Sequence, residues 1–98
     1  MTKKRSTRKR KKPKTAKPEK FFVLVTGVPI KNLKELVNNL ETMNDWVFNH
    51  HVNDTRNDFS SWIKDVLDEE VLAKEIKDIR NIKEMENKIL KYLVNTYL

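Results

Sequence analysis

Residues 57–70 read NDFSSWIKDVLDEE, and this stretch decides the fold class. Asn57 and Asp58 are helix-capping residues, and they stand directly before a run of apolar residues. Four apolar side chains of the run recur every three or four positions and so share one face of a helix: Phe59, Trp62, Ile63 and Val66. Asp68 is placed to cap a following helix, with Glu69 and Glu70 in its first turn, where carboxylates are favourable. The stretch predicts two consecutive helices with apolar inner faces.

The same two signals, a capping residue and apolar helical spacing, recur on both sides of this stretch. Asn32, followed three places later by Glu35, predicts a helix that runs to about Met43. Asn44-Asp45 predicts a short second helix, and the last helix is expected over about residues 82–97. The apolar residues of this last helix form two neighbouring stripes, which indicates packing against more than one element.

A short β-prone run, FFVLVT, extends from Phe21 to Thr26 and is closed by Gly27. The chain offers no second convincing strand, so the run is expected to pair with another protomer or to pack as an extended segment. The chain could therefore form a homo-oligomer, either through Phe21-Thr26 or through helical faces. The predicted fold is mainly α: a small helical bundle of four to five helices with a short N-terminal extended or β segment, within a helical domain of residues 21–98.

Charge divides the chain into two unlike parts. The whole sequence holds 21 Lys and Arg against 14 Asp and Glu, a formal net charge of +7. Residues 1–20 hold eleven of the basic residues and one acid, Glu19, which gives +10, whereas residues 21–98 carry −3. Residues 1–20 contain Pro13 and Pro18 and no large apolar residue after the first methionine. They cannot build a core and are expected to form a disordered basic tail.

A basic tail of this kind suits a polyanion, because Lys and Arg can follow a phosphate backbone and displace its counterions. Eight of the eleven cations are Lys, which favours phosphate contacts without strong sequence specificity. The candidate nucleic-acid-binding residues are the cations of the tail: Lys3, Lys4, Arg5, Arg8, Lys9, Arg10, Lys11, Lys12, Lys14, Lys17 and Lys20. The Lys/Pro/Ala/Thr mixture of residues 12–20 resembles the tails of chromatin proteins and of many ribosomal proteins. We expect a nucleoid-associated, DNA-binding protein, with a ribosome- or rRNA-associated protein as the alternative.

Other uses of the tail stay open. The run at residues 8–12 would serve as a nuclear-import signal in a host with a nucleus, and the tail would be incidental on a protein-interaction adaptor or dimerisation module. Anionic lipid attracts the same charges, but no amphipathic helix or lipidation motif accompanies them. The sequence has no cysteine, no apolar run near the roughly 20 residues that span a bilayer, and no signal peptide. We expect a cytoplasmic protein with no membrane partner.

His50 and His51 belong to the polar stretch HHVNDTR (residues 50–56), which is rich in loop-forming residues and predicts a loop. Imidazole beside carboxylate can bind zinc or transfer protons, so these histidines are the candidates for a metal or catalytic site. Adjacent histidines on a helix point in different directions, however, and a chain with one glycine has no phosphate-binding loop. We expect packing and capping roles, and therefore no enzyme, no metal and no cofactor.

Two further groups allow a binding role. The aromatic residues Trp46, Phe48, Phe59 and Trp62 could stack on unpaired bases, but their helical spacing favours the core. Five acids are close in sequence: Asp65, Asp68, Glu69, Glu70 and Glu75. They predict a solvated helix start, and they could also attract a basic partner or the protein's own tail.

The stretch NDFSSWIKDVLDEE, with LKEL at residues 33–36 and His50 or His51 upstream and Leu72-Ala73 downstream, resembles a small domain family of unknown function found in archaea and bacteria. The likeness covers roughly residues 21–80. It implies a compact helical domain that occurs alone or appended to other proteins. It implies no known activity, so no functional residue is transferred. The basic tail lies outside the shared region, and an archaeal source would exclude the nuclear signal.

Overall fold

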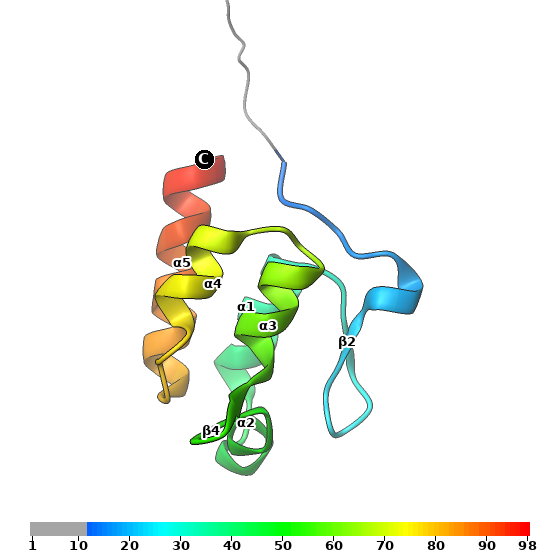
Figure 1. Ribbon diagram of the computed structural model, residues 1–98, viewed down its shortest axis with the longest axis vertical. Helices are drawn as coiled ribbons and strands as arrows, with labels where there is room; N and C mark the ends of the chain where they lie inside the picture. Colours follow the sequence, from blue (N-terminus) through cyan, green and yellow to red (C-terminus); the bar gives the residue numbers. More distant parts are fainter. Residues whose placement is uncertain (1–11) are drawn as a thin grey trace, which may run out of the picture.

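Five α-helices and two short β-hairpins make up the part of the chain that the computed structural model describes, residues 12–98 (Figure 1). The elements follow one another as η1 (a 3-10 turn, Pro18–Lys20), β2 (Phe22–Val23), β3 (Pro29–Ile30), α1 (Leu33–Thr42), α2 (Asp45–His51), β4 (Val52–Asn53), β5 (Arg56–Asn57), α3 (Asp58–Asp65), α4 (Glu70–Ile76) and α5 (Ile82–Tyr97). The predicted fold class, mainly α with a short N-terminal β segment, is confirmed. None of the described helices is both long enough and apolar enough to cross a lipid bilayer.

Asparagine side chains begin three of the described helices. Asn32, Asn57 and Asn81 each accept a hydrogen bond from the backbone N–H three positions later, at 3.0, 3.0 and 2.9 Å. Such a cap satisfies a donor left open at the helix start and stabilises the helix by about 1 kcal/mol. The start of α4 differs from the prediction. Asp68 has a φ of 60° and forms the turn after α3, and the residue before α4 is Glu69. The left-handed backbone of Asp68 is not the extended backbone of an N-cap, which explains the difference.

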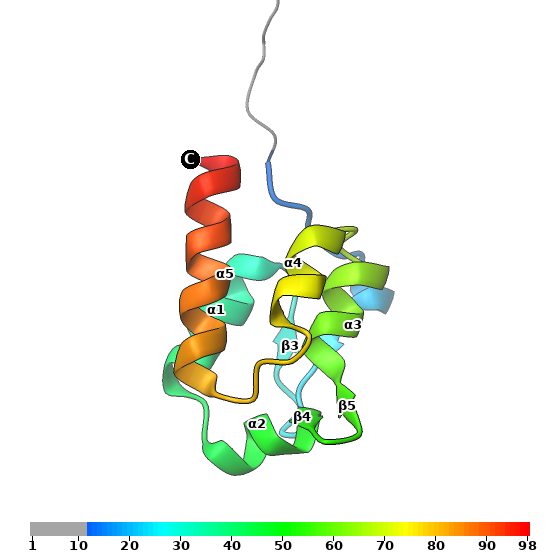
Figure 2. The same cartoon turned by 60° about the vertical axis from the view of Figure 1, so that its left-hand side comes forward.

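The helices pack mainly in two pairs: α3 lies against α4 and α1 lies against α5, while α4 also contacts α5 (Figure 2). The largest fully buried side chains come from all five helices and from β3 and the α3–α4 turn: Phe48, Phe59, Ile30, Leu33, Leu36, Leu40, Ile63, Leu67, Leu72, Ile76, Met85 and Ile89. The predicted inner face of α3 is confirmed for Phe59, Trp62 and Ile63, which are buried. Val66, the fourth predicted residue, follows the end of α3 and is partly buried against the core. On α5, contact with two elements is confirmed, but two of its apolar residues, Leu90 and Val94, remain 40% and 52% exposed.

The extended run that begins at Phe21 has a pairing partner within the chain. β2 pairs antiparallel with β3, and the partners are Phe22 with Ile30 and Val23 with Pro29. Gly27 has a φ of 94°, and its N–H donates to the carbonyl oxygen of Leu24 at 2.7 Å, which closes the hairpin. The prediction of an unpaired strand is therefore wrong. The second strand was missed because it has two residues and one is Pro29, which argues against a strand.

The polar stretch at residues 50–56 is also structured, so the prediction of a loop is wrong. His50 and His51 end α2, and the chain then forms the β4–β5 hairpin. His51 and Val52 are buried, with 5% and 2% of their surfaces exposed. The Arg56 guanidinium donates to the carbonyl oxygen of His50 at 2.8 Å. Composition predicted a loop because it does not reveal that these polar groups find partners inside the fold.

Residues 12–20, the second half of the predicted tail, run beside the helical body, and we call this segment the strap (Figure 1). Ala16 of the strap is 7% exposed and belongs to the hydrophobic core. Packing therefore begins before the domain boundary predicted at residue 21, and the strap differs from the expected disordered tail. Residues 1–11 of the predicted tail lie outside the described residues.

Candidate nucleic-acid interface

Backbone pairing fixes the middle of the strap to the body. The N–H of Ala16 donates to the carbonyl oxygen of Lys31 at 2.8 Å, and Thr15 forms an antiparallel bridge with Asn32. The side-chain amide of Asn32 also donates to the Thr15 hydroxyl at 3.4 Å. The strap thus adds a short extended segment beside the chain that leaves β3. Because the Ala16 side chain is a single methyl group, it can be buried while the two backbones approach.

Trp62 of α3 fixes the other end of the strap. Its indole N–H donates to the carbonyl oxygen of Lys20 at 2.8 Å, and the Trp62 side chain is buried. Pro18 opens the η1 turn, in which the N–H of Lys20 donates to the carbonyl oxygen of Lys17 at 2.7 Å. Proline favours the first position of a helical turn because its φ is already set. With both anchors in place, the strap has a defined path over the body.

All four lysines of the strap are exposed: Lys12, Lys14, Lys17 and Lys20. They are the predicted nucleic-acid-binding residues that the structure places, and their ammonium groups are accessible to a ligand. The other seven predicted binding residues lie outside the described residues: Lys3, Lys4, Arg5, Arg8, Lys9, Arg10 and Lys11.

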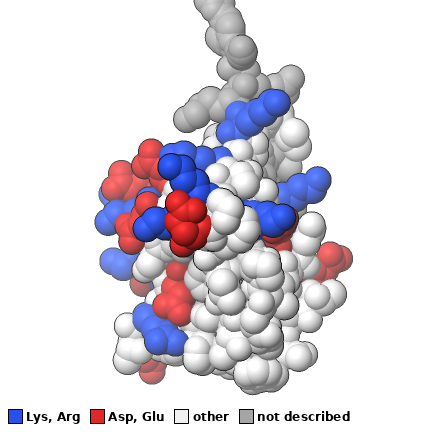
Figure 3. Space-filling view, turned by 90° about the vertical axis from the view of Figure 1, so that its right-hand side faces the viewer, with Lys and Arg blue, Asp and Glu red and all other residues white. Residues whose placement is uncertain are grey.

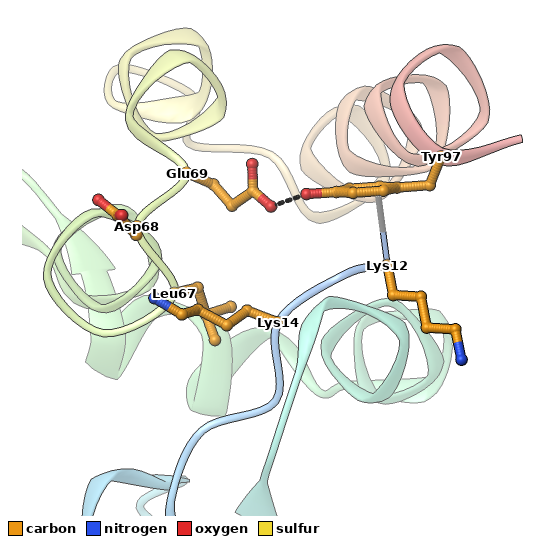
Figure 4. Close-up of a pocket in the computed structure, with 6 residues that line it drawn as sticks. All are labelled: Lys12, Lys14, Leu67, Asp68, Glu69 and Tyr97. Atoms are coloured by element: carbon orange, nitrogen blue, oxygen red, sulfur yellow. Dashed lines mark hydrogen bonds between the residues drawn. The ribbon is translucent and has the colours of Figure 1, made fainter. Parts of the chain in front are cut away.

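Carboxylates lie on the other side of the strap. A cavity of about 260 Å³ is lined by Lys12, Lys14, Leu67, Asp68, Glu69 and Tyr97 (Figure 4). A second cavity, of about 380 Å³, is lined by Lys14, Thr15, Ala16, Lys17, Lys20, Asp65 and Val66. Figure 4 shows the Lys14 side chain extending toward Leu67, whereas the Lys12 side chain points away from Glu69. We call the two cavities, which share Lys14, the strap groove; it has lysines on one wall and acids on the other.

Both signs of charge occur on the side of the molecule that carries the strap and the β2–β3 hairpin. Figure 3 shows Lys and Arg interspersed with Asp and Glu over the upper part of this face, and few charged groups over the lower part. The hairpin contributes to the uncharged area, because residues 22–30 contain no ionisable side chain. A phosphate chain that approached the strap would therefore meet cations with carboxylates close beside them.

Glu69 of the strap groove accepts hydrogen bonds from both tyrosines of the chain. The Tyr92 hydroxyl donates to Oε1 at 2.5 Å, and the Tyr97 hydroxyl donates to Oε2. Burial, and next the hydrogen bond to Glu69, raises the pKa of Tyr92 to about 12, and the same causes raise the pKa of Tyr97. Both phenols therefore stay protonated donors at neutral pH, with both carboxylate oxygens of Glu69 as acceptors. This contact joins the end of α5 to the start of α4.

Residues 11–97 match the family described as "Family of unknown function (DUF5752)". The chain belongs to the DUF5752 family. No curated protein and no solved structure matches it. The resemblance seen around NDFSSWIKDVLDEE is confirmed. The match begins at residue 11, so the expectation that the whole basic tail lies outside the shared region is wrong: the strap belongs to it.

In this DUF5752 chain the two ring nitrogens of His51 are both engaged. Nε2 lies 3.0 Å from the backbone N–H nitrogen of Val25, and Nδ1 lies 3.0 Å from Oδ2 of Asp58. Because a backbone N–H can only donate, Nε2 is the acceptor and Nδ1 carries the proton that faces Asp58. His50 is exposed, and its ring meets that of His51 edge-on. Within residues 12–98, no group of three or more His, Asp or Glu side chains is arranged to hold a metal ion.

Three of the four aromatic residues considered for base stacking are buried, as their spacing predicted: Phe48, Phe59 and Trp62. Trp46 is the exception, with 59% of its surface exposed. It lies on the short helix α2, whose buried residues are Val47, Phe48 and His51, and only this one side of the helix is covered. Of these four aromatic rings, that of Trp46 is accessible to a partner.

Sequence reasoning missed the strap anchors and the role of Glu69. One sequence signal for the strap was present: Pro18 with Glu19 behind it suits the first turn of a helix. The contacts of Glu69 with Tyr92 and Tyr97 join residues 23 and 28 positions apart, and no local pattern announces them.

Proposed function

We propose that this protein binds nucleic acid through the phosphate backbone, with the cations of residues 1–20 as the contact residues and the helical body as their carrier. The observation that carries the proposal is the concentration of eleven Lys and Arg against a single acid in these 20 residues. Four of the eleven, on the strap, are exposed on a backbone that is anchored at Ala16 and Lys20. Exposed cations on a defined path can neutralise successive phosphates and release their counterions.

The proposed ligand is DNA, bound without strong sequence specificity. Eight of the eleven cations are Lys, which acts as a point charge and favours phosphate contacts, and phosphate contacts carry no sequence information directly. Residues 21–98 carry −3, which disfavours a broad phosphate-binding surface on the helices themselves. The cellular place that follows from this proposal is the nucleoid, in the cytoplasm; rRNA binding on the ribosome is the alternative that the test must separate.

The test is the salt dependence of binding by the full chain to a 30-base-pair duplex DNA and to a ribosomal RNA hairpin with the same number of phosphates. If about six cations engage duplex phosphates, log affinity should fall against log salt with a slope of roughly −5. Stronger binding to the hairpin at equal salt would favour the ribosomal alternative. No binding to either probe at about 50 mM salt, where such contacts are strongest, would refute the proposal.

A matched pair of variants locates the contacts. The strap variant replaces the four strap lysines by Gln: Lys12, Lys14, Lys17 and Lys20. The control variant makes the same replacement by Gln at four exposed lysines of the helical body: Lys34, Lys74, Lys77 and Lys88. Both lose four positive charges. In the strap variant, the slope of log affinity against log salt should become shallower by about 0.9 for each phosphate contact removed. The control variant should keep the wild-type slope. If the slope became shallower by the same amount in both variants, binding would depend on the overall charge of the molecule and not on the strap.

A protein-interaction adaptor or dimerisation module is the second candidate, and the β2–β3 hairpin favours it. Val23, Val25 and Val28 are 58%, 42% and 41% exposed on a hairpin without ionisable side chains. Beside the hairpin lies a cavity of about 170 Å³ whose lining is also uncharged: Leu24, Thr26, Val28, Asn39, Thr42, Met43, Asn44 and Val47. Exposed apolar side chains that gather in a patch are typical of interaction sites, and these three valines belong to one short hairpin. Sedimentation of the full chain tests self-association, and the variant Val23→Ser/Val28→Ser tests whether the hairpin forms the contact. A wild-type chain that stays monomeric at about 100 µM, a concentration that would populate weak dimers, would exclude self-association.

A further inference from the structure

The strap groove brings the basic strap against acids from a distant part of the chain. Asp65 is the last residue of α3, and Asp68 and Glu69 form the connection to α4. Asp65 lines the same cavity as Lys14, Lys17 and Lys20, and the other two acids line the cavity that Lys12 and Lys14 share. The anchors at Ala16 and Lys20 hold the backbone of the strap in this place, on the wall of the groove opposite the acids.

The carboxylates of this wall are available to attract the strap lysines. Asp65 and Asp68 are exposed, and among residues 12–98 no ion pair within 4 Å involves either of them. Glu69 accepts hydrogen bonds from two tyrosine hydroxyls through its two carboxylate oxygens. Attraction between unlike charges acts over a Debye length of about 10 Å at 0.1 M salt, so the acids can attract the strap lysines without direct contact.

We propose that Asp65, Asp68 and Glu69 mask the strap lysines, so that a polyanion binds the strap only in competition with the protein's own carboxylates. A single phosphate group cannot displace three acids, whereas a polymer with closely spaced phosphates presents many charges at once. The masking therefore selects long, dense polyanions over small phosphate compounds. The inference rests on the proposed function only in naming nucleic acid as the polyanion met in the cell.

The test compares two double variants of the full chain that make the same change in net charge. The groove variant, Asp65→Asn/Asp68→Asn, removes two acids from the strap groove. Glu69 is kept because it accepts hydrogen bonds from both tyrosines. Both changes suit the fold: asparagine tolerates the φ of 60° at Asp68, and the end of a helix disfavours a negative charge at Asp65. The control, Glu41→Gln/Asp45→Asn, removes two exposed acids at the α1–α2 junction, which lies away from the strap (Figure 1).

Two readouts are used: the salt concentration at which each protein elutes from heparin, and its affinity for a 30-base-pair duplex DNA. The groove variant should bind the duplex about two- to fivefold more tightly than wild type at 0.1 M salt, and the difference should shrink as salt is raised. It should also elute later from heparin than the control variant. The masking would be overturned if both double variants bound the polyanions more tightly than wild type by the same factor, or if the groove variant bound them no more tightly than wild type. A gain on heparin alone, with no duplex binding by any of the three proteins, would support the masking and refute the proposed nucleic-acid function.

Discussion

The indole N–H of Trp62 donates to the backbone carbonyl oxygen of Lys20 at 2.8 Å, a hydrogen bond that spans 42 positions of the sequence. The bond ties the end of the basic strap to the centre of α3, where the Trp62 ring also packs edge-on against Phe22. One side chain therefore serves both the hydrophobic core and the attachment of the strap. The position of the four strap lysines depends on this attachment.

Trp62→Phe should lower the free energy of unfolding by about 1–3 kcal/mol, because it removes the only donor of the indole ring and leaves a smaller ring in a packed site. Urea unfolding followed by circular dichroism measures this change. Trp46→Phe is the matched control: Trp46 is 59% exposed, and its replacement should change stability by about 0.5 kcal/mol or less. If Trp62→Phe lowered the free energy of unfolding no more than Trp46→Phe does, the contact with Lys20 would not stabilise the fold.

His51→Ala should lower the free energy of unfolding by about 2–4 kcal/mol. The change leaves the Val25 N–H and the Asp58 carboxylate without the imidazole, and it removes a ring that lies 5.0 Å from Phe22 and 5.5 Å from Phe59, centroid to centroid. The adjacent residue provides the control. His50→Ala alters an exposed side chain and should change stability by about 0.5 kcal/mol or less. A larger loss for His50→Ala than for His51→Ala would contradict the structural role assigned to His51.

The helices could be predicted from the sequence because their signals are local. Asn57 is followed by apolar residues at helical spacing, and the cap and the buried face both follow from positions a few residues apart. Asn32 and Glu35 announced α1 in the same way. The family resemblance rested on the same local stretch, and the match over residues 11–97 confirms it.

The parts that could not be predicted depend on distant partners. The imidazole of His51 is buried because the Val25 N–H, 26 positions away, satisfies its second nitrogen. Ala16 is buried because the backbone of Lys31 pairs with it, and a single alanine among lysines and prolines gives no apolar pattern. The placement of the strap lysines beside Asp65 follows from these contacts. Sequence could suggest attraction between tail and acids, but the register of that contact is set by long-range packing.

Tyr92 and Tyr97 should titrate well above the pH at which an exposed tyrosine does. The sequence holds two tyrosines, so the ultraviolet absorbance of phenolate reports these two residues alone. In the native chain the pKa of Tyr92 is raised to about 12 and that of Tyr97 is also raised, whereas both should titrate near 10, roughly the model-peptide value, once the chain is denatured. Native tyrosines that titrate together with denatured ones would contradict the contact with Glu69.

The same shift predicts how stability depends on pH. Since the folded pKa is raised above the unfolded one, the folded chain holds its phenol protons more tightly, and this contribution to stability is complete below about pH 10. It is lost as the pH rises from there through about 12, the folded pKa of Tyr92. Urea unfolding at a series of pH values should show this decline. Glu69→Gln should lower both tyrosine pKa values, because it removes the negative charge beside them while keeping an acceptor.

Glu86 is a charged residue of α5 whose side chain is largely buried, and replacing it by an apolar residue should stabilise the fold. It is 8% exposed, and its Oε1 has no hydrogen-bond partner among the described residues. Lys83 Nζ lies 3.2 Å from this oxygen, but the geometry is not that of a hydrogen bond, and the Lys83 side chain is 71% exposed. One solvated lysine compensates poorly for the desolvation of a carboxylate.

Glu86→Met keeps a long, unbranched side chain and should raise the free energy of unfolding at pH 7 by about 1 kcal/mol. Glu84→Met is the control on the same helix; Glu84 is exposed in the first turn, where its charge is favourable, so this variant should lose a few tenths of a kcal/mol. Lys83→Met, which removes the nearby cation and leaves the largely buried carboxyl group in place, should be destabilising, because Glu86 would then lose the Lys83 ammonium group. If Glu86→Met proved more destabilising than Lys83→Met, the carboxylate would be a net stabilising group in the packing of α5.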